Sequence, residues 1–200
     1  MNRPSLICLL WLMPVIMRAQ DIPQRAQPSV TKQSENVVSG LYTQFVARHP
    51  LGIPYGADMK AFAPYLSLAL RHRFDLYNAC LIDWRRRTPD PSLKPPVGLI
   101  ENGVFSGANE EAEPEAFHIV KTEPGKDSSL VYVQLTVGDP PNKPLVWYVA
   151  AVVVNEKGRP VVNDVLYLSG ENGEVESQLS KDMSSGCDGA RWNGEGRHPR

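Results

Sequence analysis

Residues 145–154 read LVWYVAAVVV and decide the fold class of this chain. The run is apolar at successive positions, rich in β-branched side chains, and followed by Asn155. Such a run is typical of a strand that is covered on both of its faces. Because a strand of this kind needs a neighbour on each side, residues 145–154 predict the centre of a sheet.

Shorter runs with apolar residues at every second position lie on both sides of this centre. In residues 130–137 the apolar side chains alternate with mixed ones, which predicts one dry face and one wetter face. Residues 99–105, 116–122 and 160–168 are further strand candidates, separated by Gly, Pro, Asn and Asp turns. The short connections favour antiparallel neighbours, so we expect a curved antiparallel sheet of four to five strands.

Ahead of the sheet the apolar spacing changes to three and four, which predicts helices. A first helix from Ser34 to about Pro50 has an apolar stripe at Val38, Leu41, Tyr42 and Phe45. A longer helix from about Asp58 has a stripe at Phe62, Leu66, Leu70, Phe74, Tyr77, Leu81 and Trp84. Residues 174–183 predict a last short helix. The fold class is therefore α+β, with N-terminal helices packed on the sheet and a short C-terminal helix.

The composition is that of an ordinary globular protein. The chain has 200 residues, of which 42% are hydrophobic and 22% charged, and its net charge is -1 at pH 7. The densest cationic run, Arg85-Arg86-Arg87, falls at a predicted helix end, where positive charge is stabilised by exposed carbonyls. We expect no nucleic-acid partner, and no glycine-rich phosphate loop or Gly-x-Ser-x-Gly elbow suggests a cofactor or a serine nucleophile.

The N-terminus has the pattern of a cleavable export signal. Arg3 precedes the apolar run Leu6–Ile16, which is shorter than a membrane span requires, and Ala19 offers a cleavage context. We therefore expect a signal peptide at residues 1–19, a flexible tether at 20–34, one domain at 35–194 and a disordered tail at 195–200. The product would be periplasmic in a cell with two membranes and otherwise secreted, with no integral membrane span after cleavage.

Signal cleavage removes Cys8 and leaves Cys80 and Cys187. An even number of cysteines in an exported chain predicts a disulfide, since exported thiols are oxidised where geometry permits. The bond would be worth on the order of 4 kcal/mol in the chain-entropy model. Two independently buried thiols are the alternative.

The last strand candidate, Val162-Asn163-Asp164-Val165-Leu166-Tyr167, resembles the W-x-I-x-D-I-x-Y closing strand of nuclear-transport-factor-2-like, or cystatin-like, cone domains. The tail from Leu179 to Trp192, with Cys-Asp-Gly-x-Arg-Trp, is similar to that of an exported bacterial family described as a domain of unknown function. The resemblance covers about residues 35–194, although Val162 stands where an aromatic residue is common. It implies a cone fold and export, and it implies no activity.

Relatives of the cone fold often hold a pocket between the sheet and the long helix, where Asp, His or Tyr act as general acid or base. The candidates for such a pocket are His72, Asp83, His118, Asp164 and Tyr167. None is paired by spacing: His72 and Asp75 are neighbours on a helix, but Arg71 with Asp75 is an equally good surface ion pair. We assign no catalytic residue, and the histidines lack the spacing of a metal site.

Arg191 and Trp192 are candidate protein contacts, because an aromatic ring beside a guanidinium is a typical contact hot spot. Trp147 is a further candidate, because an exposed sheet face could bind a ligand or a second copy of the chain. In the structural alternative, which we favour for the tail, Trp192 packs the tail onto the domain. Core packing explains the apolar residues on one face of the sheet, and the other face is free for a ligand or a second copy of the chain. The sequence leaves both faces open for Trp147.

We expect an exported, non-enzymatic binding or protein-interaction module. Its partner would be an unknown protein, a small apolar ligand or a second copy of the chain. A small pocket hydrolase or isomerase is the first alternative, and it requires a histidine and a carboxylate within hydrogen-bond reach in one cavity. An inhibitor or immunity-type protein, using the acidic loop at residues 110–115, is the second.

Overall fold

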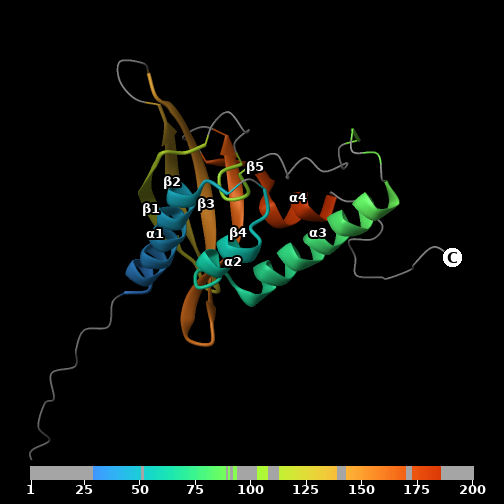
Figure 1. Ribbon diagram of the computed structural model, residues 1–200. Coiled ribbons are helices and arrows are strands. Elements are labelled where there is room, and N and C mark those ends of the chain that lie inside the picture. The colour runs from blue at the N-terminus through green and yellow to red at the C-terminus, as the bar shows by residue number, and fades with distance from the viewer. Residues whose placement is uncertain are drawn as a thin grey trace, which may run out of the picture.

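The computed structural model describes residues 29–50, 52–88, 90, 92–93, 103–107, 113–138, 143–169 and 173–185. Its elements in chain order are α1 (Val30–Arg48), α2 (Gly56–Phe62), α3 (Leu68–Arg87), β1 (Ala116–Pro124), β2 (Ser128–Val137), β3 (Leu145–Glu156), β4 (Arg159–Ser169), β5 (Glu174–Gln178) and α4 (Leu179–Ser185). Helices thus come first, a sheet follows, and a short helix ends the described chain (Figure 1). The predicted α+β fold class is confirmed.

The strands form one open antiparallel sheet in chain order, β1-β2-β3-β4-β5. Residues 145–154 lie in β3, the middle strand, which pairs with β2 on one side and β4 on the other. The strands predicted at 116–122, 130–137 and 160–168 are contained in β1, β2 and β4. The apolar pattern of the sequence therefore located the sheet and its centre correctly.

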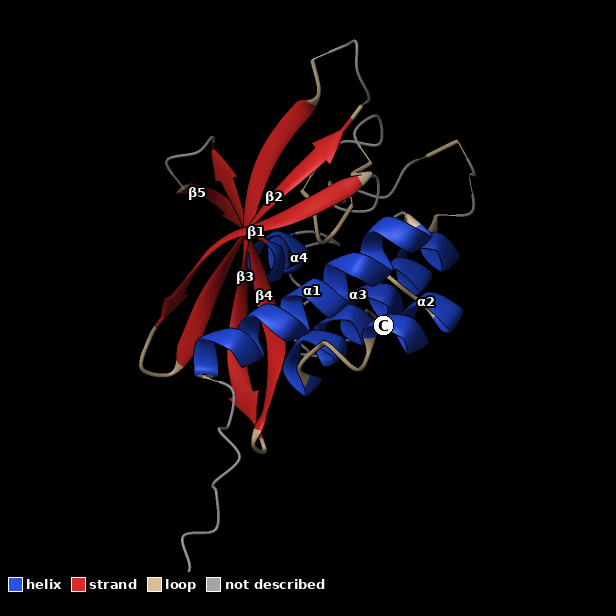
Figure 2. Cartoon of the chain, turned by 90° about the vertical axis from the view of Figure 1, so that its left-hand side faces the viewer, coloured by secondary structure: helices blue, strands red, loops and turns tan. Residues whose placement is uncertain are grey.

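Helices α1, α2 and α3 lie together on one side of the sheet (Figure 2). The side chains of α1 that face the sheet, among them Val38 and Leu41, are fully buried, and so are Val131, Val133 and Leu135 of β2. Burying one such side chain fully stabilises the fold by about 1.5–3 kcal/mol. The alternating side chains of β2 point to the opposite face of the sheet, where they stay partly exposed.

The prediction of one long helix from Asp58 to Trp84 is wrong in one respect, because this segment forms two helices, α2 and α3. The connection forms a parallel bridge to β4, in which Ser67 N donates to Val162 O at 2.9 Å and Val162 N donates to Tyr65 O at 2.8 Å. Two residues in this segment favour the break. Pro64 has no amide hydrogen to donate, and the Ser67 side chain caps α3 by accepting from Leu70 N at 2.9 Å. The apolar stripe survives because Phe62, Leu66 and Leu70 are all buried on the same side.

The segment predicted as a helix at residues 174–183 is instead a short strand followed by a helix. Val175 of β5 pairs with Leu168 of β4, and α4 begins only at Leu179. Leu179 and Met183 then join the main core cluster. The apolar spacing of this short segment fits both assignments, and pairing with the edge of β4 decides between them.

The strand predicted at residues 99–105 is also not found in its described part. Residues 104–106 form a turn, in which Ser106 N and Gly107 N both donate to Gly103 O. Gly107 has φ +66°, a left-handed conformation that glycine adopts readily. Residues 99–102 lie outside the described residues.

Helix α1 begins earlier than the sequence predicts. Ser29 caps it by accepting a hydrogen bond from Lys32 N, so residues 30–34 of the predicted tether are helical. The predicted signal peptide, Cys187, Arg191 with Trp192 and the predicted tail at 195–200 all lie outside the described residues. Among the helices of the described residues, none combines the length and the apolar character that a membrane crossing requires.

Candidate functional site

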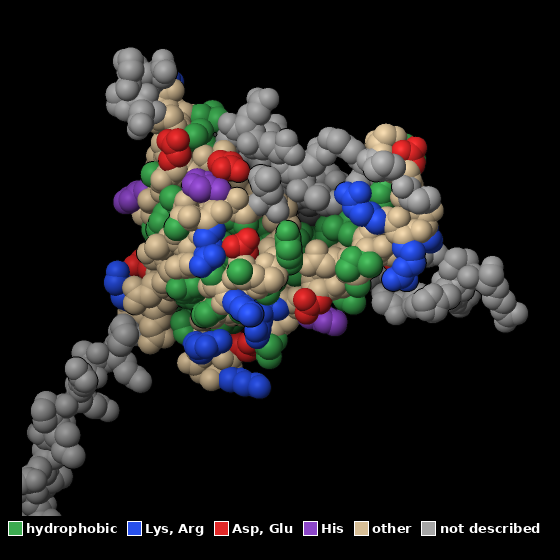
Figure 3. All heavy atoms as spheres, viewed as in Figure 1, with side chains coloured by type: hydrophobic (Ala, Val, Ile, Leu, Met, Phe, Trp, Pro, Cys, Tyr) green, Lys and Arg blue, Asp and Glu red, His purple; other side chains and the backbone are tan. Residues whose placement is uncertain are grey.

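The structure does not bring the predicted histidine and carboxylate candidates into one cavity. His72 on α3 and His118 on β1 are both exposed. Asp83 is partly exposed and accepts a hydrogen bond from Arg87 Nε at 3.2 Å, a surface ion pair one helical turn apart. Figure 3 shows basic side chains at this end of α3, where Arg85, Arg86 and Arg87 form the last turn. Positive charge there complements the exposed carbonyls of the helix end.

Asp164 is buried, with 3% of its surface exposed, and it holds the start of α4. Its Oδ1 accepts from Ser180 N at 3.0 Å and from Val165 N at 2.9 Å, while Oδ2 accepts from Gln178 Nε2 at 2.5 Å. Arg73 Nη1 on α3 lies 3.8 Å from the same Oδ2. This carboxylate is occupied by structural donors, and it joins β4, α3 and α4.

The space between the helices and the sheet is filled at one end by residues 103–107, which we call the plug turn. Phe105 is fully buried at its centre. The centroid of its ring lies 5.2 Å from that of Phe62, 5.7 Å from Phe45 and 6.1 Å from Phe74. Three helices thus supply the aromatic shell around one side chain of the plug turn.

Three aromatic side chains donate hydrogen bonds to the backbone of the plug turn. Tyr42 Oη on α1 donates to Phe105 O at 2.8 Å, and Tyr167 Oη on β4 donates to Val104 O at 2.8 Å. Trp147 Nε1 on β3 donates to Ser106 O at 3.0 Å. Trp147 and Tyr167, candidates for a partner contact and a pocket, therefore meet here as anchors of a buried turn.

Both tyrosine hydroxyls of this end keep their protons over a wide pH range. Burial raises the pKa of Tyr42 above its ordinary value of 10.0. Burial also raises the pKa of Tyr167 well above 10.0, and the nearby Asp182, Tyr42 and Asp164 add to the shift. Each hydroxyl is therefore a donor, as its carbonyl partner requires.

Sequence reasoning missed the plug turn because it assigned Val104 and Phe105 to a strand. The signal that could have located it is the pair of glycines at its ends. A Cβ on Gly107 would come within 2.6 Å of the Tyr167 ring, so this position has no room for a side chain. A glycine at each end of an apolar pair fits a turn inserted into a core as well as it fits a strand end.

A cleft of about 230 Å³ opens at the opposite end of the same layer. We call it the end cleft. It lies between the first turns of α1, the β1–β2 turn and the β3–β4 hairpin, and it is lined by residues such as Ser34, Ser129 and Val153. None of the five pocket candidates named from the sequence is among its lining residues.

The sheet face opposite the helices, which we call the outer sheet face, has an apolar centre among polar residues. By strand alternation its apolar side chains are Leu130, Tyr132, Val146, Tyr148, Val152, Val154, Leu166 and Val175. The same alternation places Ser128, Gln134 and Thr136 of β2 and His118 of β1 on this face. Val146 and Val175 are 37% and 55% exposed. Within the described part of the chain no helix covers this face, since α1, α2 and α3 lie together on the other side and the apolar residues of α4 belong to the core there (Figure 2).

Polar side chains border the outer sheet face at β1. Lys121 Nζ donates to Glu123 Oε1 at 2.6 Å, and Tyr132 Oη donates to Glu123 Oε2 at 3.0 Å. Lys121 Nζ also lies 4.2 Å from the centroid of the Tyr132 ring. These contacts form a polar rim beside the apolar centre.

The acidic loop at residues 110–115 is described only from Glu113 onward. Glu113 Oε2 lies 3.3 Å from His49 Nδ1, and Glu115 Oε2 accepts from Gly138 N at 3.1 Å. Over the described residues, no three His, Cys, Asp or Glu side chains gather in a way that could hold a metal ion. No protein-family model, curated protein or solved structure matches the chain.

Proposed function

We propose that the protein is an exported, non-enzymatic interaction module that binds through its outer sheet face, and that a second copy of the chain is the occupant of this face. The proposal is supported by the apolar side chains at the centre of this face and by the lack of any helix over it in the described part of the chain. Large exposed apolar patches on globular proteins mark interaction sites more often than not.

The packing of the domain interior favours a binding function at the surface over a catalytic function in an internal pocket. Phe105 fills the layer at the end where Tyr167 lies, and Asp164 is engaged by Ser180 and Gln178. Of the described candidates, no histidine shares a cavity with a carboxylate. No observation therefore favours the hydrolase or isomerase alternative.

The dimensions of the outer sheet face fit a self-pairing interface. Strands lie about 4.8 Å apart and residues rise about 3.3 Å along a strand, so the face from β1 to β5 and from Val146 to Val154 measures roughly 20 Å by 27 Å. This area, on the order of 500 Å² before side-chain relief, approaches the roughly 800 Å² per partner of a standard interface. An apolar centre with a polar rim at Lys121 and Glu123 is the usual anatomy of such a contact.

A two-fold contact is the simplest way to cover this face. In a two-fold dimer each copy presents the same patch, so a patch with an apolar centre meets an equally apolar one. Burial of these side chains removes apolar surface from water in both copies at once, which stabilises the pair without a further partner.

Export and the disulfide form part of the same proposal. The N-terminal pattern from Arg3 to Ala19 supports passage out of the cytoplasm. Cys80 is partly buried on α3 and packs against the core, and we propose that it pairs with Cys187, which lies outside the described residues. Mass measurement before and after thiol alkylation, with and without reductant, tests the bond: a mass gain from alkylation without reductant would contradict it.

The oligomeric state of the purified protein, with its N-terminus as the host leaves it, tests the proposed function. We expect a dimer by light scattering at about 100 µM, because about 500 Å² on each copy buries roughly 1,000 Å² in total, which is the lower limit for a specific interface. Val146→Glu and Val175→Glu place a charge on the outer sheet face at exposed positions, and each should produce the monomer.

Ile82→Glu is the matched control, because Ile82 is 61% exposed but lies on α3. It should leave the dimer unchanged. A wild-type protein that is monomeric at about 100 µM would contradict the self-pairing, and so would a dimer that survives both sheet variants.

A further inference from the structure

The end cleft exists because two apolar stripes of the core continue into serines. On α1 the stripe of Phe45, Leu41 and Val38 continues one turn further with Ser34. On β2 the buried alternation of Leu135, Val133 and Val131 continues with Ser129. Both serines are buried, at 2% and 4% exposure, so they occupy core positions.

Serine at a core position has two consequences. Its side chain is smaller than valine or leucine, so the layer between α1 and the sheet is left with space at this end. It also places a hydroxyl where the rest of the stripe is apolar. The result is the end cleft of about 230 Å³, whose lining includes Val30, Ser34, Ser129, Val153, Asn155 and Pro160.

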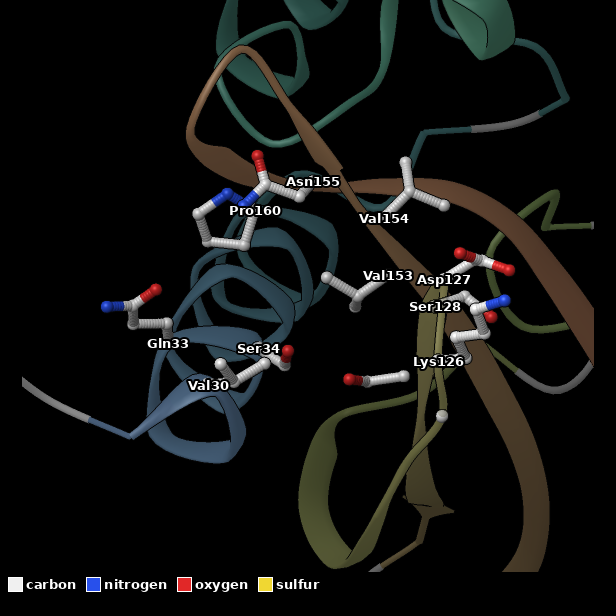
Figure 4. Close-up of a pocket in the computed structure, with 12 residues that line it drawn as sticks. Val30, Gln33, Ser34, Lys126, Asp127, Ser128, Val153, Val154, Asn155 and Pro160 are labelled. Carbon is white, nitrogen blue, oxygen red and sulfur yellow. The ribbon is translucent and has the colours of Figure 1, made fainter.

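The end cleft is concave, with a floor formed by strand residues and a wall formed by α1. Ser129 pairs with Val153 across the two strands, which makes these two residues the floor. Ser34 on α1 faces the space above Val153, as Figure 4 shows. The cleft is larger than the roughly 150 Å³ cavity that accepts benzene and smaller than the roughly 300–1,000 Å³ sites of drug-sized ligands.

The hydroxyls of Ser34 and Ser129 are available to a ligand. Among the described residues, neither side chain makes a hydrogen bond, and neither oxygen is sealed off from solvent. Because both oxygens are open to solvent, a ligand gains from the two serines only if its own polar groups replace the hydrogen bonds that water makes to them.

The charges of the cleft indicate the class of ligand. The deep polar groups, Ser34 and Ser129, are neutral and can both donate and accept. Lys126 and Asp127 lie in the exposed β1–β2 turn at the rim, where water solvates them. A charged ligand would leave its charge in the depth of the cleft without a counter-charge, which is costly.

We propose that the end cleft binds a small, neutral, hydroxyl-rich molecule of about monosaccharide size. Its hydroxyls would bond to Ser34 and Ser129, and one of its C–H faces would pack on Val153 and Pro160. This proposal rests on the α1 end of the layer alone, so it is independent of pairing through the outer sheet face.

Ligand titration followed by two-dimensional amide NMR of the full purified protein tests the proposal. The probes are glucose, galactose, mannose and glycerol, with glucuronate and glucosamine as the charged counterparts. We expect saturable shifts at residues 30–34, 125–129 and 153–160 with at least one neutral sugar or glycerol, at millimolar dissociation constants or tighter. The charged counterparts should bind at least tenfold more weakly.

Ser129→Val and Ser34→Val extend the two apolar stripes into the cleft, and each should weaken the binding of the neutral probe at least tenfold. Ser39→Val is the matched control, because Ser39 lies on the same helix and does not line the cleft. It should leave binding unchanged. The proposal is overturned if no neutral probe gives saturable shifts at these residues, if the charged probes bind as tightly, or if both cleft variants bind like the control.

Discussion

At the end of the layer where β3 begins, Phe105 reaches in between α1, α2 and α3. Tyr42, Tyr167 and Trp147 each donate to one backbone carbonyl of the plug turn. At the end where β3 finishes, the buried stripes of α1 and β2 end in Ser34 and Ser129, and a cleft remains. The same helix and the same strands bound both ends. The ends differ in the side chains that the stripes present, in the plug turn that fills one of them, and in α2 and α3, whose Phe62 and Phe74 surround Phe105 at the closed end.

Single residues therefore decide whether this layer is filled or open. A large ring from a turn closes one end, and two small hydroxyl side chains keep the other open. Stability should therefore concentrate at the closed end and ligand access at the open end, since packed cores contribute stability and concave polar sites contribute binding.

The largest effect is expected from Phe105→Ala. Removal of a fully buried phenyl ring leaves a cavity between Phe45, Phe62 and Phe74, and such changes cost about 3–5 kcal/mol. Urea unfolding followed by circular dichroism measures this loss. Phe105→Leu, which retains most of the volume, should lose less than half as much. An equal loss for both variants would show that ring volume does not close this end.

The second largest loss of stability is expected at alkaline pH, through the two buried tyrosines of the closed end. The folded protein holds the pKa of Tyr42 and of Tyr167 above 10.0, so their contribution to stability is complete below pH 10 and is lost as pH rises above it. Each pH unit above 10 removes about 1.4 kcal/mol per buried tyrosine. Absorbance of tyrosinate against pH, compared with circular dichroism, should show these two groups ionising only with unfolding. Their ionisation in a protein that is still folded would contradict the account.

A single anchor of the plug turn should matter less. Tyr167→Phe removes the donor to Val104 O and leaves that carbonyl without its partner, which costs about 1–3 kcal/mol. Tyr132→Phe is the control, because its hydroxyl bonds to the exposed Glu123 on the outer sheet face, where water replaces the donor. Thermal unfolding of both variants should rank the loss for Tyr167 above that for Tyr132. The reverse order would show that the hydrogen bond from Tyr167 to Val104 O does not stabilise the plug turn.

The smallest stability change belongs to the open end. Ser129→Val adds apolar volume to a cleft that has room for it, so we expect no loss and a gain of up to about 1 kcal/mol. The same thermal unfolding series measures it. A loss above about 1.5 kcal/mol, the usual sign of overpacking, would mean that the cleft has no free volume beside Ser129.

The sheet was predictable from the sequence because residues 145–154 carry an unambiguous signal. The helical stripes were predictable in the same way, and Phe62, Leu66 and Leu70 are buried as their spacing indicates. The break between α2 and α3 was not predicted, because the bridge of Leu66 to Val162 is a long-range contact that local spacing does not encode. Pro64 and Ser67 were local signals that the apolar stripe outweighed.

The candidate sites were predicted less well, for a physical reason. Asp164 and Tyr167 were predicted as pocket residues, but they bond to structural partners, Ser180 and Val104, that are distant in sequence. The end cleft was missed because a serine within an apolar stripe looks like an ordinary tolerated residue. Only the packing of α1 over β2 shows that the two serines line the same cleft.

Native-state amide hydrogen exchange compares the two ends of the layer in one experiment. Ser106 N and Gly107 N donate to Gly103 O inside the plug turn, and we expect them to exchange only through global unfolding, with the same free energy as Val149 in β3. Lys32 N, which donates to Ser29 Oγ in the first turn of α1, should exchange faster through local opening. Exchange of Ser106 and Gly107 as fast as that of Lys32 would mean that the plug turn leaves the core of the folded protein, and it would contradict the account of a closed interior.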